Sequence, residues 1–273
     1  MSFSFPDGFT AVACPARRLA AALETTPNGV IGHICFNFPD KHNVIDLEGW
    51  QAIAPLMAAF AEVDNIRVIV LRGVGGRAFV AGADIAQFDE VLSGPEGTDF
   101  DRATVSAFDA IAACPIPTLA AIEGYCIGGG LGIAAACDIR ISRDDGRFGV
   151  PAGKLGLAYP ANATRHLAKL VGPAEAKRIL FTADPLDSVT ALRIGLVQEV
   201  FDADSFDDGL AAILAQITAN APLSLQTSKY ILDNPHADAA AVKKRLADCL
   251  ASADYEEGRT AFMQKRKPFF KGK

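Results

Sequence analysis

Two segments of this chain pass from an apolar, strand-like run through glycine into a helix-like run. They are Phe79–Ile85 and Gly124–Gly130, and the second ends in three consecutive glycines. The first N–H groups of a helix have no partner within the helix, and glycine allows a ligand oxygen to approach them closely. Two such N–H groups from separate loops, aimed at one point, would form an oxyanion hole. These two segments are therefore the first candidates for a functional site.

A plainer interpretation is that the glycines serve tight turns of an α/β protein. Nucleotide-binding motifs do not account for them. Gly128 and Gly130 are followed by Ile133, where G-x-G-x-x-G needs a third glycine, and no G-x-S-x-G nucleophile elbow occurs. Gly149 lies one residue too close to Gly153 for a P-loop. The turn interpretation and the oxyanion-hole interpretation both remain open at this point.

The first 200 residues alternate strand-like and helix-like segments. The apolar runs 19–25 and 30–36 are joined by Pro27-Asn28-Gly29, which predicts a hairpin. Asp46 is a suitable cap for a helix that begins at Leu47. Strands and helices in this order indicate an α/β fold of stacked ββα turns with parallel pairing. Further strands are expected at 68–71, 118–122 and 139–142, helices at 83–90 and 101–113, and a loop at 93–97.

From about Phe201 onward the pattern becomes helical throughout. We expect residues 1–200 to form the α/β core and residues 201–273 to form a helical oligomerisation domain. This domain carries more apolar residues than one two-helix layer needs, so part of its surface is expected to lie against another subunit. Its helices are predicted at 206–220, 222–232 and 236–263. The apolar residues include Leu210, Ile213, Leu214, Ile217, Leu223, Leu225, Ile231 and Leu246.

The composition limits the partners. The formal net charge is −6 and the pI is near 5.3, which argues against a general affinity for nucleic acid. The 6 cysteines and 4 histidines show no metal-binding spacing, so we expect no metal site and reduced thiols in a cytoplasmic protein. The most apolar stretch, 119–137, is interrupted by Glu123 and by glycines. We therefore expect no membrane span, and the N-terminus does not resemble a signal peptide.

Several segments resemble the enoyl-CoA hydratase/isomerase (crotonase) family, in the same order along the chain. Phe79–Ile85 is similar to the family's F-x-A-G-A-D-I stretch, and Gly124–Gly130 is similar to its G-x-x-x-G-G-G loop. The resemblance runs from about residue 19 to the C-terminus. It implies a crotonase-like spiral of ββα turns with a C-terminal helical domain, assembled as a homotrimer or a dimer of trimers. Further matching segments are Cys137–Ile141 with Phe148-Gly149, Val171–Thr182, Ala191–Val197 and Phe262–Phe270.

The resemblance also implies roles for individual residues. The oxyanion donors correspond to the N–H groups of Ala83 and Gly129, which would hold the thioester oxygen of an acyl-CoA and stabilise its enolate. Coenzyme A then enters as part of the substrate, and no other cofactor is expected. Lys41 and Lys265 are weaker candidates for contacts with coenzyme A, since each is equally well explained as a solvated surface lysine. The remaining candidates for contacts with coenzyme A are Ala81, Asp84, Ile85, Ala86 and Phe262.

The resemblance fails at the positions that carry the usual acid and base. Hydratases of this family place glutamates at the positions of Gly132 and Ala152, which here can only line the acyl site. Family isomerases generally keep the second glutamate, so Ala152 argues against that activity as well. The dehalogenase branch needs an aspartate at the position of Pro160. An oxyanion hole without its usual acid and base is what the sequence retains.

Tyr159 is the polar residue of most interest near these positions. It ends a Leu-Gly-x-x-Tyr run, which resembles the segment with a pocket tyrosine in the family's malonyl-type decarboxylases. Alternatively, Tyr159 is a half-buried tyrosine at a helix start. The sequence thus predicts an acyl-CoA enzyme that is a lyase lacking both glutamates. The alternatives are a malonyl-type acyl-CoA decarboxylase and a catalytically silent acyl-CoA-binding protein, while RNA binding is disfavoured by the net acidity.

Overall fold

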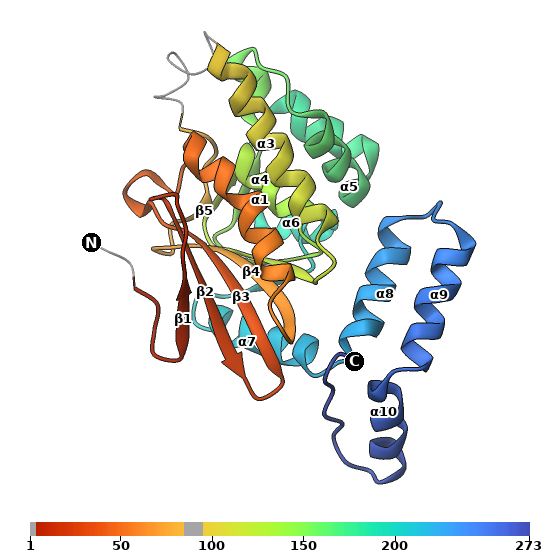
Figure 1. Cartoon of the computed structure of the whole chain (residues 1–273). Helices are drawn as coiled ribbons and strands as arrows, with labels where there is room; N and C mark the ends of the chain where they lie inside the picture. Colours follow the sequence, from red (N-terminus) through yellow and green to blue (C-terminus); the bar gives the residue numbers. More distant parts are fainter. Residues whose placement is uncertain (1–3, 85–94) are drawn as a thin grey trace.

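The computed structural model describes residues 4–84 and 95–273, and its core contains two β-sheets (Figure 1). The large sheet has the order β1-β2-β3-β4-β6-β8-β11. Its first two pairings are antiparallel and all later ones are parallel. The strands are β1 (Phe9–Val12), β2 (Leu19–Thr26), β3 (Gly29–Phe36), β4 (Ile66–Gly73), β6 (Thr118–Ile122), β8 (Ile139–Arg143) and β11 (Glu199–Phe201).

The small sheet has the order β10-β9-β7-β5. Strands β4, β6 and β8 are neighbours in the large sheet, and the strands that follow each of them are neighbours in the small one. The chain therefore repeats one turn, with a strand in each sheet and then a helix, as the sequence predicts. The strands of the small sheet are β5 (Ala78–Val80), β7 (Tyr125–Ile127), β9 (Arg147–Gly149) and β10 (Leu186–Asp187).

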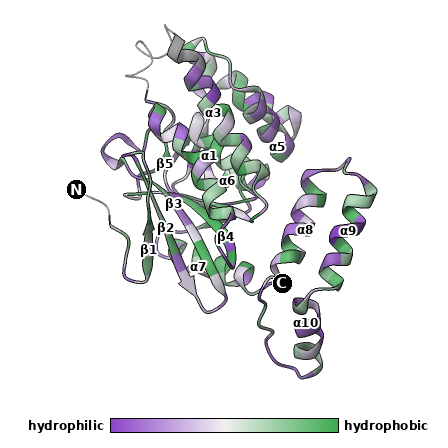
Figure 2. Cartoon of the chain, in the orientation of Figure 1, coloured by the Kyte–Doolittle hydropathy of each residue, from purple (hydrophilic) through white to green (hydrophobic). Residues whose placement is uncertain are grey.

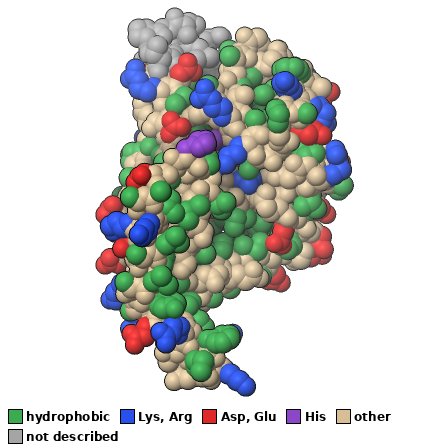
Figure 3. Space-filling model, turned by 90° about the vertical axis from the view of Figure 1, so that its right-hand side faces the viewer, with side chains coloured by type: hydrophobic (Ala, Val, Ile, Leu, Met, Phe, Trp, Pro, Cys, Tyr) green, Lys and Arg blue, Asp and Glu red, His purple; other side chains and the backbone are tan. Residues whose placement is uncertain are grey.

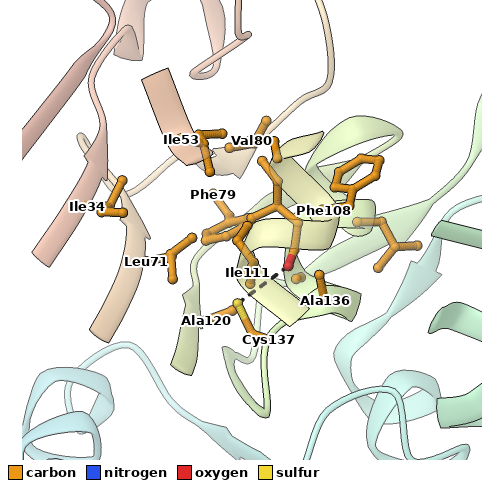
Figure 4. Packing of buried hydrophobic residues seen from close by; sticks show 14 of the residues in the cluster. Ile34, Ile53, Leu71, Phe79, Val80, Phe108, Ile111, Ala120, Ala136 and Cys137 are labelled. Atoms are coloured by element: carbon orange, nitrogen blue, oxygen red, sulfur yellow. Dashed lines mark hydrogen bonds between the residues drawn. The ribbon is translucent and has the colours of Figure 1, made fainter. Parts of the chain in front are cut away.

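Helices cover the sheets and close the core. The main buried cluster joins strands and helices, and Figure 4 shows Leu71 of β4, Phe79 of β5 and Ile111 of α3 converging within it. Figure 2 shows that the sheets are largely hydrophobic, whereas the outer helices carry both hydrophobic and hydrophilic residues. The core helices are α1 (Leu47–Ala61), α3 (Pro95–Ala113), α4 (Gly129–Ala136), α5 (Ala161–Thr182) and α6 (Ser188–Arg193), with short 3-10 helices at Pro39–Lys41 and Pro151–Leu155.

Local signals in the sequence are confirmed where they depend on near neighbours. β2 and β3 form the predicted hairpin, and the Gly49 N–H donates to the Asp46 side chain at 2.9 Å to cap α1. The predicted loop at 93–97 is wrong for residues 95–97, because α3 begins at Pro95, and proline fits the first turn of a helix. Residues 83–84 are not helical either, since Ala83 pairs with Ile45 in a parallel bridge. The rest of the helix predicted at 83–90 lies outside the described residues.

The C-terminal part contains α7 (Phe206–Thr218), α8 (Pro222–Asp233), α9 (Ala239–Leu250) and α10 (Ala253–Met263). α7 packs on the large sheet through Phe206, Leu210 and Leu214. α8 to α10 project beyond the sheets (Figure 1). The prediction of a single helix at 236–263 is wrong, because the helix is interrupted between Leu250 and Ala253. Ser252 caps the start of α10, and its hydroxyl accepts from the Tyr255 N–H at 3.1 Å.

The last residues of the chain return to the core. The Arg67 guanidinium donates to the Phe270 carbonyl at 2.6 Å, and the Asp254 carboxylate accepts hydrogen bonds from the N–H groups of Lys271 and Gly272.

The surface of the C-terminal part is exposed in the isolated chain. α9 has no fully buried residue, and hydrophobic side chains gather on the face of the molecule shown in Figure 3. Within the described residues, no helix is both long and apolar enough to span a bilayer.

Candidate active site

The two glycine-rich segments predicted from the sequence lie against each other. The Ile45 N–H donates to the Gly82 carbonyl at 3.0 Å, and the Asp84 N–H donates to the Ile45 carbonyl at 3.1 Å. This pairing leaves the Ala83 N–H on the other side of the strand. Gly82 has φ +107°, and a Cβ built on it would lie 4.0 Å from the Gly129 nitrogen. The Ala83 segment therefore approaches the start of α4 closely.

The Gly129 N–H belongs to the first turn of α4. The first hydrogen bond of this helix runs from the Gly132 N–H to the Gly128 carbonyl at 3.1 Å, so the Gly129 N–H precedes it and has no acceptor within the helix. Within residues 4–84 and 95–273, neither Gly129 nor Ala83 donates a backbone hydrogen bond. A side chain at position 129 would meet the Trp50 ring at 2.7 Å, so the close approach requires glycine there.

Both segments border a cavity of about 180 Å³ between α3, α4 and the 3-10 helix Pro151–Leu155. It brings together five of the predicted site residues, Ala81, Ala83, Gly129, Ala152 and Tyr159. The full described lining consists of Ala81, Gly82, Ala83, Phe100, Asp101, Thr104, Phe108, Ile127, Gly128, Gly129, Val150, Pro151, Ala152, Leu155, Leu157, Ala158, Tyr159 and Pro160.

Gly132 and Ala152, which the resemblance aligns with hydratase glutamates, differ in their surroundings. Ala152 is half-buried on the cavity wall. Gly132 lies behind the wall, where a Cβ would meet the Phe108 ring at 2.5 Å and the Tyr159 hydroxyl at 3.0 Å. The described wall contains no glutamate, and its carboxylate is that of Asp101, which is exposed on α3. An aromatic ring thus occupies the space that a side chain at position 132 would need.

Tyr159 faces the cavity from the turn before α5. Its hydroxyl donates to the Gly128 carbonyl at 3.0 Å. Burial raises the pKa of this hydroxyl well above its ordinary value, and the nearby Cys126 acts in the same direction. The hydroxyl is therefore protonated and able to donate across the physiological pH range. Donation to a substrate carboxylate would compete with the bond to Gly128.

The other predicted residues are more scattered. Asp84 is buried and pairs with Arg18 at 2.8 Å, and Arg18 also pairs with Asp46 at 3.0 Å. Lys41 is exposed, with its Nζ 6.0 Å from the centre of the Phe38 ring. Phe262 and Lys265 are exposed on α10 and just after it, and they do not line this cavity. Ile85 and Ala86 lie outside the described residues.

Two sets of residues near the site were not identified from the sequence. Phe100, Thr104 and Phe108 line the cavity from one face of α3. Their spacing of four residues in the sequence indicates that they share one face of a helix. The pair Arg17-Arg18 precedes β2 and was also overlooked. A second cavity of about 470 Å³ is lined by Arg17, Arg18, Phe38, Asp46, Leu47 and Glu48, with the Arg18 guanidinium 4.2 Å from the centre of the Phe38 ring.

Comparison with known proteins gives consistent matches over nearly the whole chain. The family model described as enoyl-CoA hydratase/isomerase matches residues 25–273. The crotonyl-CoA hydratase of Syntrophomonas wolfei is 33% identical over 239 residues, covering 86% of this chain and 92% of that protein. The short-chain-enoyl-CoA hydratase of Clostridium acetobutylicum is 30% identical over 244 residues, covering 88% and 93%. The solved structure of an enoyl-CoA hydratase/carnithine racemase from Magnetospirillum magneticum has a TM-score of 0.89 at 34% identity, covering 95% of this chain and 97% of that one.

Proposed function

Because this chain belongs to the enoyl-CoA hydratase/isomerase family, we propose that it acts on an acyl-CoA thioester whose carbonyl oxygen accepts from the N–H groups of Ala83 and Gly129. The observation that carries the proposal is that these two amides lie on one cavity and are free of backbone acceptors in the described part of the chain. Preorganised donors stabilise the negative charge that develops when an enolate forms. Coenzyme A is then part of the substrate, and the proposed reaction uses no separate cofactor.

We propose further that the reaction is that of a lyase without the usual pair of glutamates. Gly132 and Ala152 offer no proton donor or acceptor, and Asp101 is exposed on the outer part of the wall. Losing a positioned acid–base group typically costs on the order of 10²–10⁴-fold in rate. Ordinary hydration of an enoyl-CoA is therefore expected to be slow unless another group takes over this role.

Decarboxylation of a malonyl-type CoA is the second candidate, favoured by the apolar wall of the cavity. Phe108, Val150 and Leu157 would surround the substrate carboxylate and favour its loss over its solvation. The electrons of the breaking carbon–carbon bond pass into the thioester enolate as CO₂ leaves, and water then protonates the α-carbon. No base is needed, so the absence of glutamates from the described wall does not impair this reaction.

We propose that the nucleotide end of coenzyme A lies near the second cavity, whose wall carries Arg17 and Arg18 together with Asp46 and Glu48. Arg18 is already paired with Asp46 and Asp84, so Arg17 on the wall and Lys41 beside Phe38 are the cations that would meet the phosphates. Phe262 and Lys265 could contact coenzyme A only in a neighbouring subunit, which agrees with the proposed homotrimer or dimer of trimers. Phe262 is 83% exposed and Met263 is 80% exposed in the isolated chain. Sedimentation that shows a stable monomer at micromolar concentration would contradict this assembly.

A panel of acyl-CoA thioesters tests the proposed function. We would measure affinity for each thioester, hydration of crotonyl-CoA, and CO₂ release from malonyl-, methylmalonyl- and ethylmalonyl-CoA. Gly129→Ala should abolish both binding of the acyl group and turnover, because its Cβ would collide with the Trp50 ring at 2.7 Å. Gly153→Ala is the matched control, because its Cβ would make an ordinary contact at 3.6 Å with the Leu180 carbonyl.

The outcomes separate the candidates. CO₂ release identifies a decarboxylase, and hydration of crotonyl-CoA identifies a lyase of the hydratase type. Affinity without any product leaves a catalytically silent acyl-CoA-binding protein. A folded protein that binds none of the thioesters would refute the proposed function.

A further inference from the structure

One peptide unit links Tyr159 to the proposed oxyanion hole. The Tyr159 hydroxyl donates to the Gly128 carbonyl at 3.0 Å, and the nitrogen of the same peptide carries the Gly129 N–H. We propose that Tyr159 is a positioning residue, which orients this peptide and strengthens the Gly129 N–H as a hydrogen-bond donor. This inference rests on the proposed function and gives Tyr159 a role different from contact with a substrate carboxylate.

The peptide needs to be held because its backbone is unusual. Gly128 has φ 56° and ψ −116°, a conformation that is open to glycine but strained for other residues. Its N–H donates to the Gly149 carbonyl at 2.8 Å, and its carbonyl accepts from both the Gly132 N–H at 3.1 Å and the Tyr159 hydroxyl. The bond from β9 anchors the preceding peptide, whereas the two bonds to the Gly128 carbonyl come from α4 and from the turn before α5. These two bonds fix the plane of the peptide between Gly128 and Gly129 and thus the direction of the Gly129 N–H.

The hydroxyl also acts on the strength of the donor. A hydrogen bond to a peptide carbonyl draws electron density away from the peptide nitrogen, so the N–H at the other end becomes more positive. Such cooperative strengthening is about 10–30% per bond. Because burial keeps the Tyr159 hydroxyl protonated, the bond is made throughout the physiological pH range.

Gly132 leaves the space that this arrangement requires. A Cβ at position 132 would lie 3.0 Å from the Tyr159 hydroxyl oxygen and 2.5 Å from the Phe108 ring. A larger side chain there would displace the hydroxyl from the Gly128 carbonyl. The glycine at the position of a hydratase glutamate and the tyrosine hydroxyl are therefore a matched pair in this protein.

The test uses a thioester that reports the polarisation of its own carbonyl. A 4-dimethylaminocinnamoyl-CoA has an electron-rich ring conjugated to the thioester, so its absorption moves to longer wavelength when the carbonyl oxygen accepts strong hydrogen bonds. Tyr159→Phe removes the hydroxyl, while the Gly128 carbonyl keeps its bond from Gly132, so the fold should persist. Tyr230→Phe is the matched control, because Tyr230 is a half-buried tyrosine on α8, away from the cavity.

We expect the bound thioester to show a red shift in the wild type and in Tyr230→Phe. In Tyr159→Phe the thioester should still bind, with a red shift smaller by about 10–30%, the share that one neighbouring hydrogen bond contributes. Gly132→Ala, which crowds the hydroxyl without removing it, should reduce the shift in the same direction.

Three results would contradict the inference. An unchanged red shift in Tyr159→Phe would show that the hydroxyl does not act on the Gly129 amide. A folded Tyr159→Phe that no longer binds the thioester would show that the hydroxyl contacts the ligand directly. A wild-type protein that binds the thioester without any red shift would refute the proposed oxyanion hole itself. The red shift in the wild type therefore tests the proposed function, and its change in Tyr159→Phe tests this inference.

Discussion

Gly132→Ala gives a direct measure of how tightly the space behind the cavity is filled. The new Cβ would lie 2.5 Å from the Phe108 ring, which is fully buried and packs edge-on against Trp50 at 5.6 Å between ring centres. Overpacking of a buried site costs about 1–3 kcal/mol. Replacing glycine by alanine inside a helix returns about 1 kcal/mol. We therefore expect Gly132→Ala to lower the free energy of unfolding by about 1 kcal/mol.

A second substitution separates these two effects. In a Phe108→Leu background the ring atoms that meet the new Cβ are absent, so the tightest contact is removed, the milder contact with the Tyr159 hydroxyl at 3.0 Å stays, and the helix-propensity gain dominates. Gly132→Ala should then raise the free energy of unfolding by about 1 kcal/mol, and the coupling between the two positions should be about 2 kcal/mol. Urea denaturation of the wild type, both single variants and the double variant measures this coupling. The same sign for Gly132→Ala in both backgrounds would refute the packing argument.

Three further predictions follow from other buried groups and from the altered acid–base positions. Thr104→Val should raise the free energy of unfolding by about 1–2 kcal/mol in urea denaturation, because the Thr104 hydroxyl is buried and has no hydrogen-bond partner among residues 4–84 and 95–273; a decrease would contradict this. Ala152→Glu should increase hydration of crotonyl-CoA from a slow starting rate, since a carboxylate there would enter the cavity; an unchanged rate would show that a glutamate at this position alone does not restore the chemistry. Burial lowers the pKa of His166, so the His166 side chain binds a proton more readily in the unfolded protein than in the folded one. Stability from this residue is full above its ordinary pKa and is lost as the pH falls below it. The difference in unfolding free energy between pH 7 and pH 5 should thus be smaller in His166→Phe, and an equal difference would refute the assignment.

The parts of the fold that the sequence predicts well depend on short-range signals. The hairpin of β2 and β3 follows from one turn sequence, and the start of α1 follows from the capping residue Asp46. The sequence does not predict the end of α9, because Ala251 and Ser252 lie within a long run of helix-forming residues and only the cap of α10 at Ser252 marks the break. The start of α3 was missed because Pro95 and its neighbours are equally typical of a loop.

The candidate site is likewise predicted only where short-range signals in the sequence suffice. Glycine patterns predict the two segments that converge, and the cavity contains both. The contacts that fill the space of the missing glutamate side chain are long-range. Phe108 is 24 positions before Gly132 in the sequence, and the bond from Tyr159 to Gly128 spans 31 positions. No local pattern encodes such contacts, which explains why the sequence singles out Tyr159 but does not predict its hydrogen bond to the Gly128 carbonyl.

Gly132 and Ala152 differ in the space that surrounds each of them. At position 132 the freed space is occupied by the Phe108 ring and the Tyr159 hydroxyl, so a glutamate there could not be accommodated without moving both. At position 152 the wall stays open, and a larger side chain would enter the cavity. Under the proposed function, the first feature would favour strong polarisation of a thioester oxygen, and the second would leave the site without a base. We therefore propose that the site is best suited to reactions in which a breaking bond supplies the enolate electrons, because abstraction of a proton would need a group that neither position provides.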